Sequence, residues 1–210
     1  RQQISAIAGT RLHFNRFKFI GHLSGQVVNE LNEKGSAGKN VLGVNPYLSL
    51  EKRRYDYWYT MRHQIWYRNS LRVPTFNELY YNNIGNTDLN PERANQFGYN
   101  FSWSPKDKAE KVIRIKSAVY FNRITDKIVA IPTNNLFTWS IQNVGIVHAY
   151  GGEVAMNSRF ALGGKKQLIL ASSINYSFQR SIDVSDPNHP TYRHQISYIP
   201  MHTGNFDLSL

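Results

Sequence analysis

The stretch NQFGYNFSW, residues 95–103, alternates between large aromatic side chains and small or polar ones. In an extended chain Phe97, Tyr99, Phe101 and Trp103 point to one side, and the residues between them point to the other. A period of two is that of a β-strand with a single apolar face. The stretch therefore predicts a strand whose apolar face is entirely aromatic.

The same alternation recurs along most of the chain, so the aromatic strand has many companions. The apolar sides of the others are Ile4, Ala6, Ala8, Leu12 and Phe14; Leu42, Val44, Leu48 and Leu50; Ile113, Ile115, Val119 and Phe121; Val154, Met156, Phe160 and Leu162; Leu168, Leu170, Ile174, Tyr176 and Phe178; and Phe206, Leu208 and Leu210. The opposite sides are rich in Asn, Gln, Arg, Lys and Glu. This pattern predicts an all-β protein of about eight strands, longer than the usual 5 to 6 residues. The one helical signal is the capping-box spacing of Thr75 and Glu78 after Pro74.

The expected connections alternate between short polar turns and long loops. The short ones are EKRRY, SPKDKAEK and GGKKQ, and the long ones are residues 16–39, 73–94, 126–147 and 181–192. Short turns at one end and long loops at the other, joining strands of about ten residues, are typical of a transmembrane β-barrel. Polar faces would not meet inside a soluble sandwich, which needs two apolar inner faces, whereas a water-filled lumen accepts them.

Composition excludes several classes of protein. The 210 residues include no cysteine, so neither disulfides nor thiolate chemistry is available. The formal charge is +11, but the basic residues are scattered, which does not indicate nucleic-acid binding. No apolar run approaches the roughly 20 residues of a membrane-spanning helix. Because the chain starts at Arg1 and stops in mid-alternation, we expect a piece of a longer protein.

Several segments resemble one protein family in order. LRVPTFNELYY (71–81) and GNTDLNPERANQFGYNF (85–101) are similar to the part of TonB-dependent outer-membrane receptors where a strand ends in Arg-x-Pro and Leu-x-Pro-Glu leads into the next. VYFNRITDKIVAIP (119–132), WSIQNVGIVHAYGGEVAM (139–156) and YIPMHTGNFDLSL (198–210) resemble the strands that follow. Each motif is weak alone, and their shared order makes the resemblance strong.

The resemblance implies a fold: an antiparallel up-and-down meander that is part of a 22-stranded transmembrane β-barrel in the outer membrane of a Gram-negative bacterium. Residues 1–210 would be a fragment of the barrel domain, with the plug domain and the barrel-closing strands absent. The first strand would rise to the outside, with the short turns in the periplasm. We expect an open sheet whose edges, near residues 4–14 and 206–210, do not pair with each other.

It also implies a function. The parent protein would bind a scarce nutrient, such as a siderophore or cobalamin, at its extracellular loops and import it by active transport. Its partners would be outer-membrane lipid, the nutrient and the TonB complex, reached through the absent N-terminal region. Haem-type members carry a histidine between the two loop motifs, and residues 73–89 contain none, which favours the cobalamin and siderophore types.

The resemblance also assigns residues. The family-motif residues with structural roles are Pro74, Asn77, Glu78, Leu79, Gly85, Leu89, Pro91, Glu92, Asn122, Asp126, Asn143 and Gly145. The ligand-binding candidates are Arg72, Tyr80, Tyr81, Asn82, Asn83, Asn86, Asp88 and Trp139. Exposed tyrosines and asparagines are the better candidates among them, since Arg72 could serve only to organise the loop. No metal site, cofactor or catalytic residue is predicted.

Two other hypotheses stay open. The first is a soluble β-rich module that binds a ligand or glycan, with Trp103, Trp139 and Tyr150 as stacking platforms. It requires two apolar inner faces and compact loops. The second is an enzyme, in which carboxylates such as Asp126 and Glu153 would act as acid and base. No nucleophile elbow, phosphate loop or metal-spaced histidine pair supports an enzyme.

Overall fold

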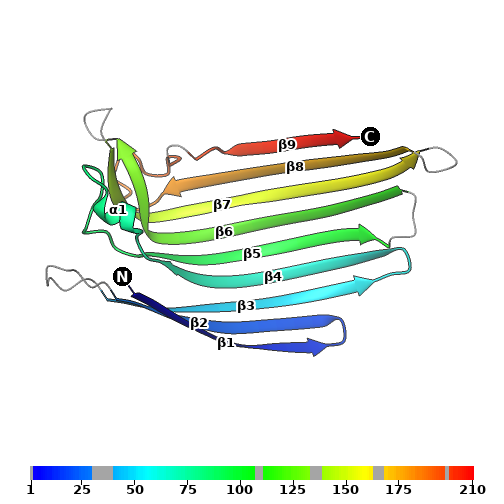
Figure 1. Ribbon diagram of the computed structural model, residues 1–210, viewed down its shortest axis with the longest axis horizontal. Coiled ribbons are helices and arrows are strands. Elements are labelled where there is room, and N and C mark those ends of the chain that lie inside the picture. Colours follow the sequence, from blue (N-terminus) through cyan, green and yellow to red (C-terminus); the bar gives the residue numbers. More distant parts are fainter. Residues whose placement is uncertain (1, 30–39, 107–110, 133–138, 163–167, 197–198) are drawn as a thin grey trace.

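The protein is a single antiparallel sheet (Figure 1). The computed structural model describes residues 2–29, 40–106, 111–132, 139–162, 168–196 and 199–210. Its elements are β1 (Gln2–Phe14), β2 (Phe17–Asn29), β3 (Val41–Tyr55), β4 (Tyr59–Arg72), α1 (Phe76–Tyr80), β5 (Glu92–Pro105), β6 (Lys111–Pro132), β7 (Trp139–Leu162), β8 (Leu168–Asp183) and β9 (His202–Ser209). Each strand pairs with its neighbour in sequence, in the order β1 to β9. The predicted all-β meander is confirmed.

The sheet is open. Within the described residues β1 pairs only with β2 and β9 only with β8, so the two edge strands do not meet. This agrees with the expected open meander. Among these residues no helix is long and apolar enough to cross a bilayer.

The predicted strand count was one too low, because residues 16–39 were assigned to a loop. They contain β2, which forms a tight hairpin with β1 through Asn15, a residue with φ of 52°. The alternation of β2 is present in the sequence but is interrupted on its apolar side by Gly21 and Gly25. Glycines weaken a strand signal, and here they hid it.

Other expected connections also need correction. EKRRY lies inside β3, and the turn that follows is Asp56–Trp58. Residues 126–147 are mostly strand, since β6 runs to Pro132 and β7 starts at Trp139. The loops expected at 73–94 and 181–192 begin or end a few residues inside strands. GGKKQ lies outside the described residues.

The direction of the first strand was predicted wrongly. Figure 1 places the β1–β2 turn at the same end of the sheet as the β3–β4 turn. The loop that carries α1 lies at the opposite end, near the start of β1. Strand β1 therefore runs from the long-loop end to the short-turn end, because the first connection is a two-residue turn rather than a long loop.

The pairing register brings every predicted apolar set to one face of the sheet, which we call the apolar face. Phe97 of β5 lies opposite Tyr67 of β4 and Phe121 of β6, and Phe121 lies opposite Tyr150 of β7. Directly paired residues share a face, so this row continues across the sheet. The predicted faces of Lys111–Arg123 are confirmed, since these residues form uninterrupted strand.

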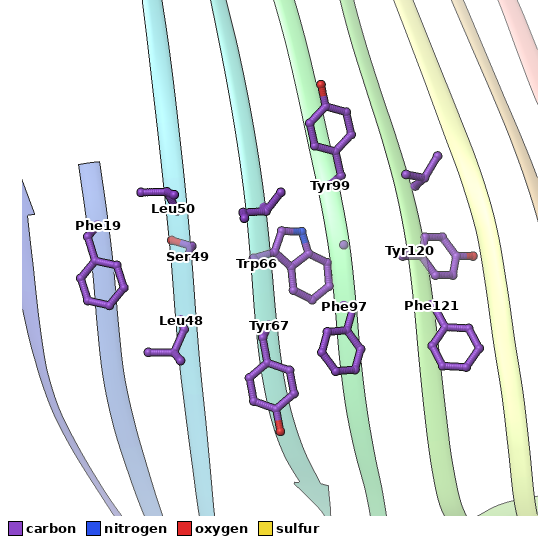
Figure 2. Close-up of a pocket in the computed structure, with 13 residues that line it drawn as sticks. Phe19, Leu48, Ser49, Leu50, Trp66, Tyr67, Phe97, Tyr99, Tyr120 and Phe121 are labelled. Carbon is purple, nitrogen blue, oxygen red and sulfur yellow. The ribbon is translucent and has the colours of Figure 1, made fainter. Parts of the chain in front are cut away.

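No second layer of described residues covers the apolar face. Large side chains such as Ile4, Ile65 and Phe206 are more than half exposed. A shallow hollow of about 620 Å³ lies in this face over strands β2 to β6, lined by Phe19, Leu48 and neighbouring aromatic rings (Figure 2). A face this apolar and this open needs an apolar environment outside the chain.

The opposite face, which we call the polar face, carries charged and amide side chains. Glu51 is only 4% exposed and lies between two arginines, with its carboxylate 2.5 Å from Arg53 Nε and 3.9 Å from Arg62 Nη1. Asn100 donates to Gln64 at 3.2 Å. A sandwich core cannot be built on this face, which argues against the soluble module.

Candidate functional site

The loop from residue 73 to 91 joins β4 to β5 and starts with a short helix. Pro74 removes a donor from the ladder, and α1 follows at once. Thr75 caps the helix: Glu78 N donates to Thr75 Oγ1 at 3.3 Å, and Thr75 N donates to Glu78 Oε2 at 2.7 Å. These reciprocal bonds make a capping box, so the predicted helical turn is confirmed.

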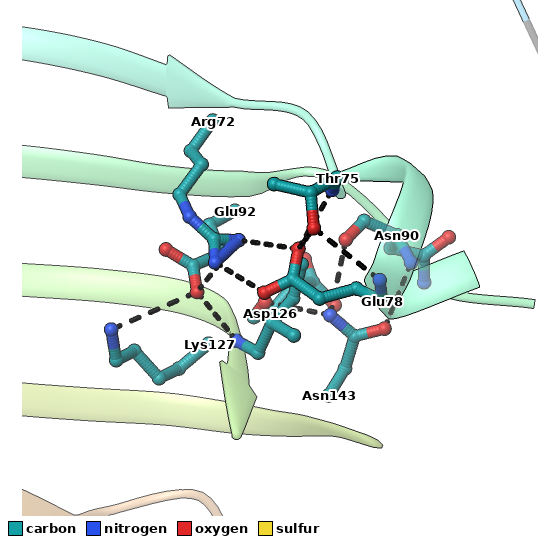
Figure 3. Close-up of polar contacts among 9 residues, drawn as sticks. Arg72, Thr75, Glu78, Asn90, Glu92, Asp126, Lys127 and Asn143 are labelled. Atoms are coloured by element: carbon teal, nitrogen blue, oxygen red, sulfur yellow. Dashed lines mark hydrogen bonds and ion pairs between the residues drawn. The ribbon is translucent and has the colours of Figure 1, made fainter. Parts of the chain in front are cut away.

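An ionic network closes the base of this loop (Figure 3). Arg72, the last residue of β4, lies opposite Glu92, the first residue of β5. Its guanidinium contacts Glu78 Oε1 at 2.5 Å and Glu92 Oε1 at 3.7 Å. The Glu92 carboxylate is buried, and its Oε1 also accepts from Ile128 N at 2.7 Å and lies 3.7 Å from Lys127 Nζ. The network therefore ties α1, β4, β5 and β6 together.

Two asparagine side chains fasten the loop to the β6–β7 hairpin. Asn143 Nδ2 donates to the carbonyls of Asp126 at 2.7 Å and Asn90 at 3.1 Å, while its Oδ1 accepts from Asn90 N at 2.8 Å. Asn86 Nδ2 donates to the Ile141 carbonyl at 3.0 Å. Asp126 has φ of 54°. The side chain of Asn143 thus holds the strand where its backbone departs from regular geometry.

Beneath the polar contacts lies a small apolar cluster. Leu79 of α1, Leu89 of the loop and Ile128 of β6 are buried together, and Ile141 of β7 packs against them. Gly85 passes so close to the end of α1 that an added Cβ would lie 2.6 Å from Tyr81 N and 2.9 Å from the Leu79 carbonyl oxygen. The loop is therefore packed against the end of the sheet.

Replacing Gly85 by alanine is expected to displace the end of α1 and destabilise the loop locally by about 1–3 kcal/mol, since the clash is with backbone. Faster amide hydrogen exchange in residues 76–86 of the full-length protein would show it. Gly25→Ala is the matched control, because nothing lies within 4 Å of the Cβ it would add. Unchanged exchange in Gly85→Ala would contradict the close approach.

The outer surface of the loop is aromatic. Phe76 and Tyr81 are 69% and 60% exposed, and Tyr80 is 38% exposed. The Phe76 and Tyr80 rings contact each other with centroids 4.9 Å apart. Asn82 and Asn83 are exposed beside them, and Asn83 has φ of 66°. Phe76, Tyr80, Tyr81 and the two asparagines form what we call the loop surface.

Comparison with known proteins identifies the family. The family described as "TonB dependent receptor-like, beta-barrel" matches residues 2–210. The chain belongs to the TonB-dependent receptor family. No curated protein sequence matches it.

Two solved structures are similar to this chain in part of their length. "Copper transporter OprC" has a TM-score of 0.67 and 16% identity over 98% of this chain and 31% of its own. "Crystal structure of the siderophore receptor PirA from Pseudomonas aeruginosa" has a TM-score of 0.46 and 13% identity over 84% of this chain and 40% of its own. The chain thus spans about a third of OprC. OprC shows the fold, and the family consists of receptors and transporters rather than enzymes.

In this TonB-dependent receptor chain, many family-motif residues lie inside the loop's own framework. Pro74, Leu79, Leu89 and Glu92 are buried. Gly145 is close to Ser185, since an added Cβ would lie 2.9 Å from Ser185 Oγ. The remaining motif residues lie in these places: Asn77 in α1, Pro91 just before β5, and Asn122 on the polar face.

Six of the eight ligand-binding candidates of the receptor fall into two groups. The side chains of Arg72 and Asn86 make contacts within the loop framework, whereas Tyr80, Tyr81, Asn82 and Asn83 lie on the loop surface. Asp88 is exposed nearby, and Trp139 is half-buried at the start of β7. Phe76 was not among the predicted candidates. It could have been found from its place directly after Thr75, the predicted cap of the helical turn, and in the structure only Leu79 of this helix is buried. Within the described residues no cluster of His, Asp and Glu could hold a metal ion.

Proposed function

We propose that this chain is the wall of an outer-membrane receptor that binds a scarce nutrient at its long loops and imports it with energy from the TonB complex. The observation that carries the proposal is the separation of the two faces. In the regularly paired parts of the described strands, every Asp and Glu lies on the polar face. These residues are Glu51, Glu92, Glu153, Asp183 and Asp207. Lipid would cover the apolar face, and water would fill the lumen.

The dimensions of the strands support a membrane location. Strands β1 to β8 have 13 to 24 residues. A tilted strand needs only about 9 to 11 residues to cross a bilayer. Two histidines on the apolar face are paired with tyrosines: His63 Nδ1 lies 2.8 Å from the Tyr99 hydroxyl, and His202 Nδ1 lies 2.8 Å from the Tyr176 hydroxyl. At the short-turn end Tyr57 and Trp58 are about three-quarters exposed, where an interfacial girdle places aromatic rings. The short turns would face the periplasm and the loop surface the cell exterior.

The loop surface suggests the class of nutrient. Exposed aromatic rings beside amides suit a bulky ligand that offers flat apolar parts and hydrogen-bonding groups. Residues 73–89 contain no histidine, so this loop has no imidazole to ligate haem iron. We propose a siderophore, cobalamin or a comparable chelate as the cargo.

The full-length receptor, purified in detergent and titrated separately with ferric siderophores, cobalamin and haem, tests the proposal. Saturable binding of a siderophore or cobalamin, and growth on it only when the TonB complex is intact, is the expected result. Submicromolar binding of haem with no binding of the others would overturn the choice of cargo.

The double substitution of Phe76 and Tyr81 by alanine is expected to weaken nutrient binding about tenfold or more, because exposed aromatic anchors carry much of the binding energy at recognition surfaces. Calorimetric titration of the full-length receptor measures the change. Tyr57→Ala removes an equally exposed ring at the opposite end of the sheet and should leave the affinity unchanged. Equal losses in both variants would exclude a specific role for the loop surface.

A further inference from the structure

Three arginines lie on the apolar face and take no part in the proposed binding of nutrient. Arg93 of β5, Arg123 of β6 and Arg180 of β8 share this face by register, since Arg123 pairs with Asn95 and Arg180 pairs with Tyr150. All three are exposed. We call them the arginine arc. An ordinary lipid-facing strand carries apolar residues, so three arginines there call for a partner.

The arginines of the arc stand at one height. Each lies twelve residues from the short-turn end of its own strand, where β5 ends at Pro105, β6 begins at Lys111 and β8 begins at Leu168. At about 3.3 Å per residue and a tilt of about 40°, twelve residues rise about 30 Å. The apolar band of such barrels is about 25 Å tall. The arc therefore lies just beyond the band, at the level of the headgroups nearest the long loops.

The arc is also compact. Arg93 is two residues from Asn95, the direct partner of Arg123, so Arg93 and Arg123 are diagonal neighbours on adjacent strands. Diagonal neighbours have backbones about 7–8 Å apart, well within the combined reach of two arginine side chains. Arg180 continues the same diagonal two strands further on, past His148 and Tyr150 of β7. One anionic group could thus contact two arginines at once.

Among the described strand residues of regular geometry, no carboxylate shares the face of the arc. The five carboxylates of regular strand geometry are all on the polar face, and no arginine of the arc makes an ion pair with a described carboxylate. Guanidinium groups bind phosphate oxygens in a bidentate manner. We propose that the arginine arc docks the phosphate groups of a lipid in the outer leaflet, whose acyl chains lie on the apolar face below. This rests on the proposed membrane location.

The test uses the full-length receptor in nanodiscs, with bis-phosphorylated lipid A as the probe and native mass spectrometry as the readout. Replacing all three arginines of the arc by glutamine is expected to lower lipid A binding about tenfold or more, since each basic residue adds roughly fivefold near a charged surface. Replacing them by lysine should restore most of it. Dephosphorylated lipid A should bind equally weakly to every variant.

A matched control removes three arginines from the polar face, Arg62, Arg114 and Arg159, by the same change to glutamine. It lowers the net charge equally and should leave lipid A binding unchanged. Equal lipid A binding by the receptor and its arc variant, or an equal loss in the control, would overturn the proposal. Heat-modifiable electrophoretic mobility reports whether each variant folds, and nutrient binding reports the proposed function. If only the lipid proposal is wrong, both measurements are unchanged.

Discussion

Arginine at Phe101 or Ile174 is expected to destabilise the full-length receptor by about 2–4 kcal/mol. Both side chains lie on the apolar face, in the middle part of β5 and β8. A guanidinium there would have to leave water for hydrocarbon without a partner. Denaturant unfolding in lipid vesicles measures the loss, and reduced assembly into the outer membrane should accompany it.

The neighbouring residues provide the control. Asn100 and Asn175 lie one step along the same strands, on the polar face, and both make side-chain hydrogen bonds there. Arginine at either position can extend into the watered lumen, so the expected cost is small. Equal destabilisation on both faces would show that the two faces do not meet different solvents.

Replacing Glu92 by alanine is expected to lower the free energy of local opening of the loop of residues 73–91 by about 2–3 kcal/mol. The change leaves the buried Ile128 N–H without its acceptor and removes the carboxylate that lies beside both Arg72 and Lys127. Hydrogen exchange of residues 76–80 and 127–128 in the full-length receptor measures it. Nutrient affinity should fall with the loss of order.

Two further variants separate charge from hydrogen bonding. Glu92→Gln keeps an acceptor for Ile128 N, so it should lower the free energy of local opening by about half as much as Glu92→Ala does. Asp207→Ala removes an exposed carboxylate from β9 and should leave the loop unchanged. If Glu92→Ala exchanges no faster than Asp207→Ala, the network does not hold the loop.

Local periodicity predicted the strands and their faces, because a period of two is a property of a few consecutive residues. Register then decides whether separate faces coincide, and here the apolar sets of β1 to β9 all do. Strand β2 was missed for a local reason, since Gly21 and Gly25 remove side chains from its apolar side. The extension of β6 beyond Asp126 was missed because that residue's left-handed backbone breaks the alternation.

The candidate site was harder to predict because its contacts are distant in sequence. The capping box joins residues three apart and was visible in the sequence. Asn143 and Asn90 are separated by 53 residues, and only the fold brings them together. Family resemblance marked both Glu92 and Asn143 as structural without saying what they touch. Ligand roles for Tyr80 and Tyr81 remain predictions.

Three sets of contacts hold the loop of residues 73–91 in place. Its two ends are joined by Arg72 and Glu92, its helix is buried at Leu79, and its far side is bonded to Asn143. The exposed aromatic rings of the loop surface are thus held by a loop that is already ordered without a ligand. In the proposed function, a loop ordered in this way would lose little conformational entropy on binding, so we expect fast capture of the nutrient.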